Sequence, residues 1–191
     1  VHYSHDANKR SICNNTIHSI DQDKNGIIWI GTDNGLSSIN LKTGVITNYQ
    51  NSAKDASSIP DNKILSVKCS DDGKVYVGTF YKGLCALNTK SGQFERFEVP
   101  KNQEIKNNAT LNENRSRVYS LHIDVEEGIL HVGTEGGLGI FDLKSSNYKR
   151  FIVFGNPSAE DATLTNRIWG ITEDSDRNLW LASYGGGLIK L

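Results

Sequence analysis

The stretch Gly26-Ile27-Ile28-Trp29-Ile30-Gly31-Thr32-Asp33-Asn34-Gly35-Leu36 recurs three more times along the chain in altered form. The later copies read GKVYVGTFYKGL from Gly73 to Leu84, GILHVGTEGGL from Gly128 to Leu138, and NLWLASYGGGL from Asn178 to Leu188. Equivalent positions in the four copies lie 47, 55 and 49 residues apart; these are Gly31, Gly78, Gly133 and Ala182. A period near ~50 residues is typical of stacked supersecondary units, so it predicts a repeat architecture.

Each repeat carries the same order of signals around this stretch. An apolar pair three residues apart comes first, and an acidic turn follows it. The recurrent stretch then places a ring two residues before its glycine or alanine: Trp29, Tyr76, His131 and Trp180. A Gly-Leu step opens a third apolar stretch, and a fourth ends on an aromatic residue. Turns rich in Asp, Asn and Gly favour hairpins, because these residues tolerate positive φ and bond to their own backbone.

Four short strands joined by hairpins in each repeat predict a propeller blade. We therefore predict an all-β chain, a β-propeller segment of about four blades, each a four-stranded antiparallel sheet. No stretch of about 11 to 18 residues shows a convincing helical period. The predicted single domain spans 1–191, with blades at 12–49, 59–97, 111–151 and 164–191, the last holding three strands.

The two ends of the chain leave two arrangements open. Residues 1–3 match the end of a fourth strand, so they are predicted as the outer strand of a preceding or a closing blade. The blades either close into a ring of four or form an open fragment of a larger ring, and we favour the fragment. Open blade faces are apolar, and they favour self-association. The chain has no methionine and begins at Val1, so we expect it to be part of a longer protein.

The composition excludes several classes of function. The formal net charge is -1, from 21 basic and 22 acidic residues, which gives no electrostatic basis for binding nucleic acid or an anionic membrane. No run approaches the ~18 apolar residues of a membrane helix. Cys13, Cys69 and Cys85 fit neither a closed disulfide framework nor a zinc site. We interpret Cys85 as a small buried hydrophobe, and a single Cys69–Cys85 bridge stays open.

Two motifs resemble chemical sites but are better interpreted as turns. Residues 21–26, DQDKNG, fit the first half of a calcium loop, yet Thr32 stands where a bidentate Glu is required. Residues 185–187 are three glycines, but a strand follows them, whereas a dinucleotide-binding loop opens a helix. The five histidines show no metal-ligand spacing, and no nucleophile elbow is present. We predict no metal, no cofactor and no catalytic residue.

The pattern I-x-x-I-x-x-D-x-x-G-x-x-W-[IV]-G-T-x-x-G-L resembles the two-component regulator propeller repeat. Residues 17–36 match it almost letter for letter, whereas the last unit has Asn178, Ala182 and Ser183 where Gly, Gly and Thr are usual. The middle units depart more, with Tyr76 and His131 in the tryptophan position.

The resemblance implies the periplasmic sensor region of a membrane-anchored hybrid two-component receptor. In that family two seven-bladed propellers precede an immunoglobulin-like domain, a membrane helix, a histidine kinase and a response regulator. The family commonly senses breakdown products of polysaccharides. The resemblance therefore implies a non-enzymatic module with an oligosaccharide ligand, in a parent protein that is a histidine kinase.

Candidate ligand-binding residues lie where the repeats differ. The first strands of a propeller line its central channel, so we expect the residues that flank the first apolar residue of each repeat to face a ligand. These positions mix cations with aromatic rings, which suit sugar rings and acidic saccharides. The predicted set is His18, Lys63, Arg117, Tyr119, Arg167 and Trp169. An alternative stays open, in which Tyr119 and Trp169 only pack between blades.

Two other functions compete with a sensor. The first is a protein-interaction platform that self-associates through a blade face. The second is a propeller lyase or hydrolase, which the missing acid/base constellation disfavours.

Overall fold

The computed structural model describes residues 1–99, 115–156 and 162–191. They form two compact units, Val1–Arg96 and Phe97–Leu191, each with its own sheets and core. Strands dominate both units, and the described part of the chain holds one short helix, α2 (Ala162–Asn166).

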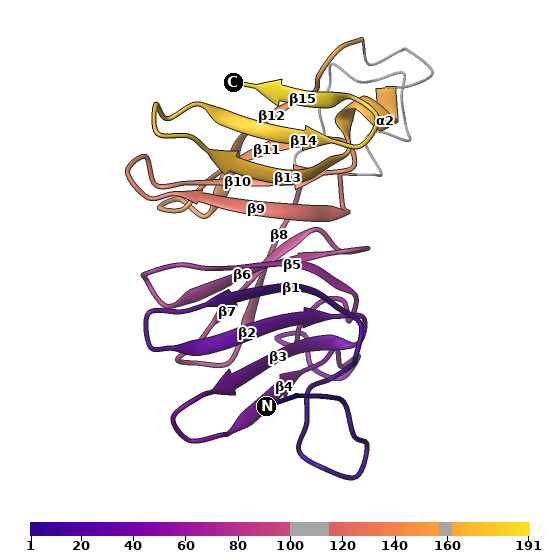
Figure 1. Ribbon diagram of the computed structural model, residues 1–191, viewed down its shortest axis with the longest axis vertical. Helices are drawn as coiled ribbons and strands as arrows, with labels where there is room; N and C mark the ends of the chain where they lie inside the picture. Colours follow the sequence, from indigo (N-terminus) through magenta and orange to yellow (C-terminus); the bar gives the residue numbers. More distant parts are fainter. Residues whose placement is uncertain (100–114, 157–161) are drawn as a thin grey trace. The chain divides into compact units, whose positions relative to one another are not determined.

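The first unit contains two antiparallel sheets in which strands pair in chain order (Figure 1). The first blade consists of β1 (Ile17–Gln22), β2 (Ile27–Thr32), β3 (Gly35–Asn40) and β4 (Ile46–Tyr49). The second blade consists of β5 (Ile64–Cys69), β6 (Lys74–Thr79), β7 (Leu84–Asn88) and β8 (Phe94–Phe97).

The second unit repeats this arrangement. The third blade consists of β9 (Val118–Asp124), β10 (Ile129–Thr134), β11 (Gly137–Asp142) and β12 (Asn147–Ile152). The fourth blade has three described strands, β13 (Ile168–Glu173), β14 (Leu179–Ser183) and β15 (Gly187–Lys190). The prediction of an all-β chain built of antiparallel blades is confirmed.

Two segments lie outside the regular pattern of blade strands. Residues 1–3, expected as an outer strand, lie in no strand, and no ladder hydrogen bonds hold them extended. Part of the linker expected before the fourth blade forms α2, because the Asn166 side chain donates to the Ala162 carbonyl at 2.7 Å and bonds the backbone of Phe154. The start of the predicted third blade, residues 111–114, lies outside the described residues.

Trp29, at the recurrent ring position, packs the first blade on the second. Trp29 is 3% exposed and belongs to one cluster with Ile64 and Val67 of the second blade. Its ring lies 5.9 Å from that of Tyr49, which in turn lies 5.9 Å from that of Phe94 in β8. The three rings thus continue the core from the first blade into the second.

The recurrent glycine allows the first strand of the next blade to come close. A Cβ added at Gly31 would lie 2.7 Å from Ile64 Cγ2 in β5, and one at Gly133 would lie 2.9 Å from the carbonyl oxygen of Ile168 in β13. Real Cβ atoms essentially never approach other atoms so closely, so both strand pairs require glycine at this position.

The acidic turn and the tryptophan form one hydrogen-bonded unit. Asp23 Oδ1 accepts the backbone N–H groups of Asn25 and Ile27, and its Oδ2 accepts the indole N–H of Trp29 at 3.2 Å. Asp174 repeats the arrangement and accepts the indole N–H of Trp180 at 2.7 Å. The interpretation of both acidic segments as hairpin turns is confirmed, because their carboxylates organise the turn.

The cysteines behave as core residues. All three thiols are free, so the bridge left open by the sequence is not formed. Cys85 is fully buried in β7, which confirms its interpretation as a small hydrophobe. Burial raises the pKa of the half-buried Cys69 thiol to about 12, so this thiol is protonated at neutral pH.

The turn carboxylate makes a testable contribution to stability. Asp23→Ala removes the acceptor of three N–H donors, one of them from the packed Trp29 ring. We expect the free energy of unfolding to fall by about 2 kcal/mol, measured by urea denaturation. Asp71→Ala, in the exposed turn of the second blade, is the matched control and should change it by less than about 0.5 kcal/mol. Equal effects of the two changes would contradict this role of Asp23.

The last blade offers a pH test of the same interaction. The Trp180 indole N–H bonded to Asp174 lowers the pKa of that carboxyl from 3.8 to about 2. Because the folded-state pKa is depressed, this stabilisation is present above about pH 4 and is lost as the pH falls toward 2. Denaturation of Asp174→Asn across this range should therefore show a shallower acid loss than wild type. Asp176→Asn, a change two residues further in the same turn, should retain the wild-type slope.

Candidate ligand-binding site

A one-residue bulge recurs in the first strand of each blade. The pairing of β1 with β2 skips from Ile17 to Ser19, so His18 has no ladder partner. The same register shift occurs in the first strand of every other blade. The bulged residues of the four blades are His18, Leu65, Tyr119 and Trp169. A bulge re-aims its side chain, and here it does so at the positions where the repeats differ most.

A second recurrent contact defines which loop residue lies beside the start of each blade. The residue after the Gly-Thr or Ala-Ser step donates its backbone N–H to the carbonyl of the residue before the first strand. The four donor–acceptor pairs are Asp33–Thr16 (3.2 Å), Phe80–Lys63 (2.9 Å), Glu135–Arg117 (3.1 Å) and Tyr184–Arg167 (2.9 Å). Each blade therefore places two variable side chains together at the same end.

In the second unit these positions assemble an ionic group around Glu135. Its carboxylate is 3% exposed and forms ion pairs with both Arg117, of the same blade, and Arg167, of the next. The two arginine side chains are partly exposed, at 34% and 23%. Two positive charges around one carboxylate leave a net charge of +1, and the shared anion fixes the position of both arginines.

Three aromatic rings stack beside this ionic group. The ring of Trp169 lies 5.5 Å from that of Tyr119 and 5.2 Å from that of Tyr184, at interplanar angles of 26° and 22°. The Arg167 guanidinium carbon lies 5.2 Å from the centre of the Tyr184 ring. Trp169 and Tyr184 are each 53% exposed. We call Arg117, Tyr119, Glu135, Arg167, Trp169 and Tyr184 the aromatic–arginine cluster.

The equivalent positions of the first unit form a smaller group. His18 Nε2 lies 2.8 Å from Asp33 Oδ1, and Lys63 Nζ lies 3.5 Å from the same oxygen. The His18 hydrogen bond, with Lys63 nearby, lowers the pKa of the Asp33 carboxyl. Lys63 Nζ also lies 4.8 Å from the centre of the Phe80 ring. The group has one exposed carboxylate where the second unit has a buried one.

The structure thus brings the six predicted residues together in two sets. His18 and Lys63 meet through Asp33 in the first unit, and the other four belong to the aromatic–arginine cluster of the second. Sequence reasoning missed the loop residues Glu135 and Tyr184. They lie directly after the Gly-Thr or Ala-Ser step, where the repeats also differ, so the rule used for the first strands would have found them. Their role in ligand binding remains our prediction.

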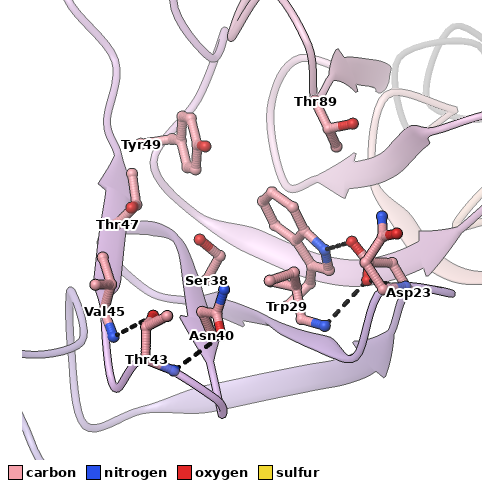
Figure 2. Close-up of a pocket in the computed structure, with 11 residues that line it drawn as sticks. Asp23, Trp29, Ser38, Asn40, Thr43, Val45, Thr47, Tyr49 and Thr89 are labelled. Atoms are coloured by element: carbon pink, nitrogen blue, oxygen red, sulfur yellow. Dashed lines mark hydrogen bonds between the residues drawn. The ribbon is translucent and has the colours of Figure 1, made fainter.

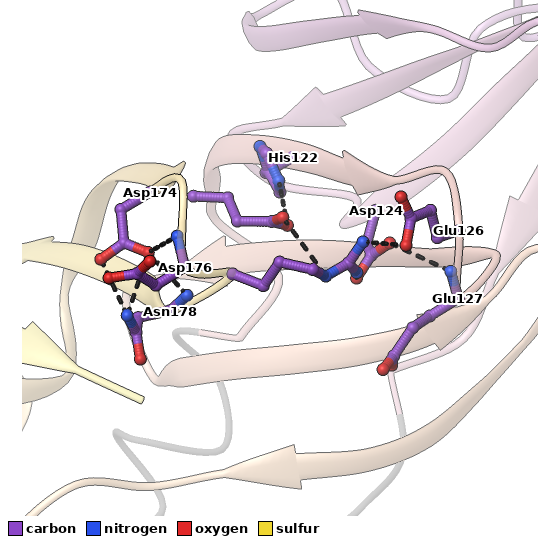
Figure 3. Close-up of polar contacts among 9 residues, drawn as sticks. His122, Asp124, Glu126, Glu127, Asp174, Asp176 and Asn178 are labelled. Atoms are coloured by element: carbon purple, nitrogen blue, oxygen red, sulfur yellow. Dashed lines mark hydrogen bonds and ion pairs between the residues drawn. The ribbon is translucent and has the colours of Figure 1, made fainter.

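A further group of charges lies at the turn end of the second unit (Figure 3). Arg177 donates to Asp124 at 2.7 Å and pairs with Glu126, and its Nε lies 3.7 Å from Glu173. His122 Nε2 lies 3.6 Å from the Glu173 carboxylate. These charges are paired with one another and link the third blade to the fourth, so we assign them to packing.

His131, which replaces tryptophan in the third blade, is half-buried. Burial lowers the pKa of its imidazole, so the ring is neutral at pH 7. Among residues 1–99, 115–156 and 162–191, no group of three or more His, Cys, Asp or Glu side chains has the geometry to hold a metal ion. No helix in the same residues is long and apolar enough to cross a membrane.

The first and last repeats match a known family. Residues 11–34 and 164–185 match the model of the two component regulator propeller. These two matches confirm the resemblance drawn from the motifs. The two middle repeats, with Tyr76 and His131 in the tryptophan position, lie outside the matched segments. No sequence match is found among curated proteins.

Solved structures share the fold. An extracellular domain assigned to the hybrid two component system BT3049 of B. thetaiotaomicron is 24% identical, with a TM-score of 0.72, over 100% of this chain and 24% of that one. The corresponding domain of BT4673 from the same organism is 22% identical, with a TM-score of 0.61, over 92% and 27%. This chain thus spans about a quarter of the length of these extracellular domains.

The same fold occurs in an enzyme. A catalytically inactive virginiamycin B lyase from Staphylococcus aureus, solved with quinupristin, is 19% identical, with a TM-score of 0.61, over 92% of this chain and 55% of that one. Because identities at this level concern the fold alone, function must be argued from the side chains of the site.

The buried carboxylate of the aromatic–arginine cluster should contribute strongly to stability. Glu135→Gln keeps the shape of the side chain but leaves two arginines without their anion. We therefore expect the free energy of unfolding, measured by urea denaturation, to fall by about 3 kcal/mol. Asp33→Asn, at the equivalent position of the first unit, removes an exposed carboxylate and should cost less than about 1 kcal/mol. Similar losses for both variants would show that burial of Glu135 is not what makes it important.

Proposed function

We propose that this chain is part of the non-enzymatic, periplasmic sensor region of a membrane-anchored hybrid two component receptor, and that its ligand derives from a polysaccharide. The observation that carries the proposal is the aromatic–arginine cluster. Trp169 is more than half exposed, and its ring stacks between two tyrosines beside two arginines.

The chemistry of the cluster suits an oligosaccharide. The apolar faces of sugar rings pack on exposed aromatic side chains, and guanidinium groups donate directional hydrogen bonds to hydroxyl and carboxylate oxygens. Glu135 holds Arg117 and Arg167 in place before any ligand arrives, which lowers the entropy lost on binding. The net charge of +1 favours a saccharide that carries an acid group.

The same geometry argues against catalysis at this cluster. A general acid or base must exchange a proton with its substrate, and Glu135 is the one carboxylate of the cluster. Both of its oxygens are engaged by arginines, and its side chain is 3% exposed. With both oxygens held by arginines and little contact with solvent, Glu135 is placed to position the arginines and not to reach a substrate proton.

The type of receptor is supported by the comparisons. The propeller repeat is the one after which two component regulators are described, and two similar structures are extracellular domains assigned to hybrid two component systems. Because this chain spans about a quarter of those domains, the kinase, the membrane anchor and the periplasmic location belong to the proposal.

A second candidate function is a self-association platform. Ile17 and Ile20 on β1 are 46% and 67% exposed, whereas the equivalent Ile64 and Val67 on β5 are 0% and 5% exposed. Large apolar side chains of this kind favour a protein partner such as a second copy. Sedimentation over a range of protein concentrations distinguishes this function from a sensor that acts as a monomer.

The sensor proposal predicts a loss of binding in Trp169→Ala. Calorimetric titration with a panel of neutral and uronic-acid oligosaccharides should identify at least one ligand for the wild-type chain. The variant should bind that ligand at least about tenfold more weakly, because it loses the exposed face of the stack. Its thermal midpoint should stay close to wild type, since Trp169 is largely exposed.

Trp180→Ala is the matched control, since Trp180 lies in the same blade but donates its indole N–H to a turn carboxylate. This change should lower the thermal midpoint and leave the affinity unchanged. Wild-type affinity in Trp169→Ala, or turnover of any oligosaccharide in the panel, would overturn the proposal.

A further inference from the structure

A hollow lies on one face of the first blade, within the first unit. Its volume is about 470 Å³, in the range of small-molecule sites, which run from about 300 to 1,000 Å³. Trp29, Ser38 and Thr47 form a row across three strands, because Ser38 pairs with Trp29 on one side and with Thr47 on the other. Tyr49 extends the lining on β4, and Thr89 of the second blade closes it (Figure 2).

Several polar groups of this hollow are uncommitted. The hydroxyl groups of Ser38, Thr47 and Tyr49 have no hydrogen-bond partner among the described residues. The side-chain nitrogen of Asn40 has none there either, whereas its side-chain oxygen accepts two backbone N–H groups of the β3–β4 turn. Ser38 is 7% exposed and lines the hollow. Such groups gain free energy when a ligand supplies the missing hydrogen bonds.

The hollow carries no charge that is free to bind an ion. Among its described lining residues, Asp23 alone is charged, and its two oxygens already accept two backbone N–H groups and the Trp29 indole. The remaining lining consists of hydroxyl groups, amides, two aromatic rings and aliphatic side chains. This combination discriminates against acids and cations and matches an uncharged polyol.

The third blade has a hollow at the equivalent place, but different side chains line it. There the row Trp29–Ser38–Thr47 is replaced by His131–Ile140–Arg150. The volume falls to about 270 Å³, and Asp124 and Arg177 in its wall are paired with each other. The repeat therefore supplies the groove, and the first blade alone, among the described blades with such a hollow, combines small uncharged side chains with aromatic rings.

We infer that the hollow of the first blade is a binding site for an uncharged pyranose or similar polyol. The sugar packs on the partly exposed Tyr49 ring and touches the edge of the buried Trp29 where that edge lines the hollow, while its hydroxyl groups bond Ser38, Asn40 and Thr47. The site lies wholly within the first unit and shares no residue with the aromatic–arginine cluster. The two sites can therefore be tested independently of each other.

Nuclear magnetic resonance tests this site directly through the indole N–H signals. The chain has three tryptophans, so it gives three such signals, each assignable from a single Trp→Phe variant. Titration with methyl β-D-glucopyranoside, up to about 50 mM to reach weak affinities, should shift the Trp29 signal with a saturable curve. Sodium glucuronate, titrated in the same way, should leave it unshifted.

Two variants locate the sugar. Ser38→Ile introduces the residue of the third blade and fills the hollow; Thr47→Arg does the same from an exposed position that does not strain the core. Each should reduce the Trp29 shift at least about tenfold at a fixed sugar concentration. Trp169→Ala, in the other site, should leave the shift unchanged.

Three results would overturn the inference: no saturable Trp29 shift, a shift that persists in a folded Thr47→Arg chain, or equal binding of glucuronate. Failure of this test with retained binding at Trp169 would leave the proposed function intact. Sugar binding at the Trp29 hollow, without any oligosaccharide binding that depends on Trp169, would refute the proposed function and support this site.

Discussion

The close approach of the first strand of one blade to the glycine of the preceding blade is the contact on which both units depend. At Gly31 and Gly133 a side chain would collide with Ile64 and Ile168, respectively. Because glycine removes that obstacle, adjacent first strands lie near enough for hydrogen bonds such as the one from Val67 N–H to Ser19 Oγ at 3.1 Å. In the second unit the bulged residues Tyr119 and Trp169 consequently become neighbours, with ring centres 5.5 Å apart.

The same contact geometry supports different chemistry in the two units. In the first, Asp33 is exposed and receives His18 and Lys63, so the group resembles an ordinary surface ion cluster. In the second, Glu135 is buried and receives two arginines, with three stacked rings beside them. The difference arises from side chains alone, since the recurrent bulge and the recurrent backbone hydrogen bond are the same in both.

Sequence reasoning succeeded where contacts are local. Asp23, Gly26 and Trp29 lie within one hairpin, so their spacing is enough to predict the turn, the strand and the buried ring. It did not identify the short helix at residues 162–166, which depends on a group distant in the chain, because the Phe154 backbone bonds to Asn166. For the site, it identified the variable first-strand residues but not Glu135 or Tyr184.

The sequence by itself determined the repeat, the hairpin order, the glycine and tryptophan that let blades pack, and the positions at which the blades differ. These features follow from local conformational preferences and from a periodicity that can be counted. Only the tertiary structure decided that Glu135 binds Arg167 from the next blade, that Trp169 stacks between two tyrosines, and that Ser38 opens a hollow beside Trp29. Such contacts join residues from different strands and blades, so they depend on how the sheets stack and on side-chain volumes that no local pattern records.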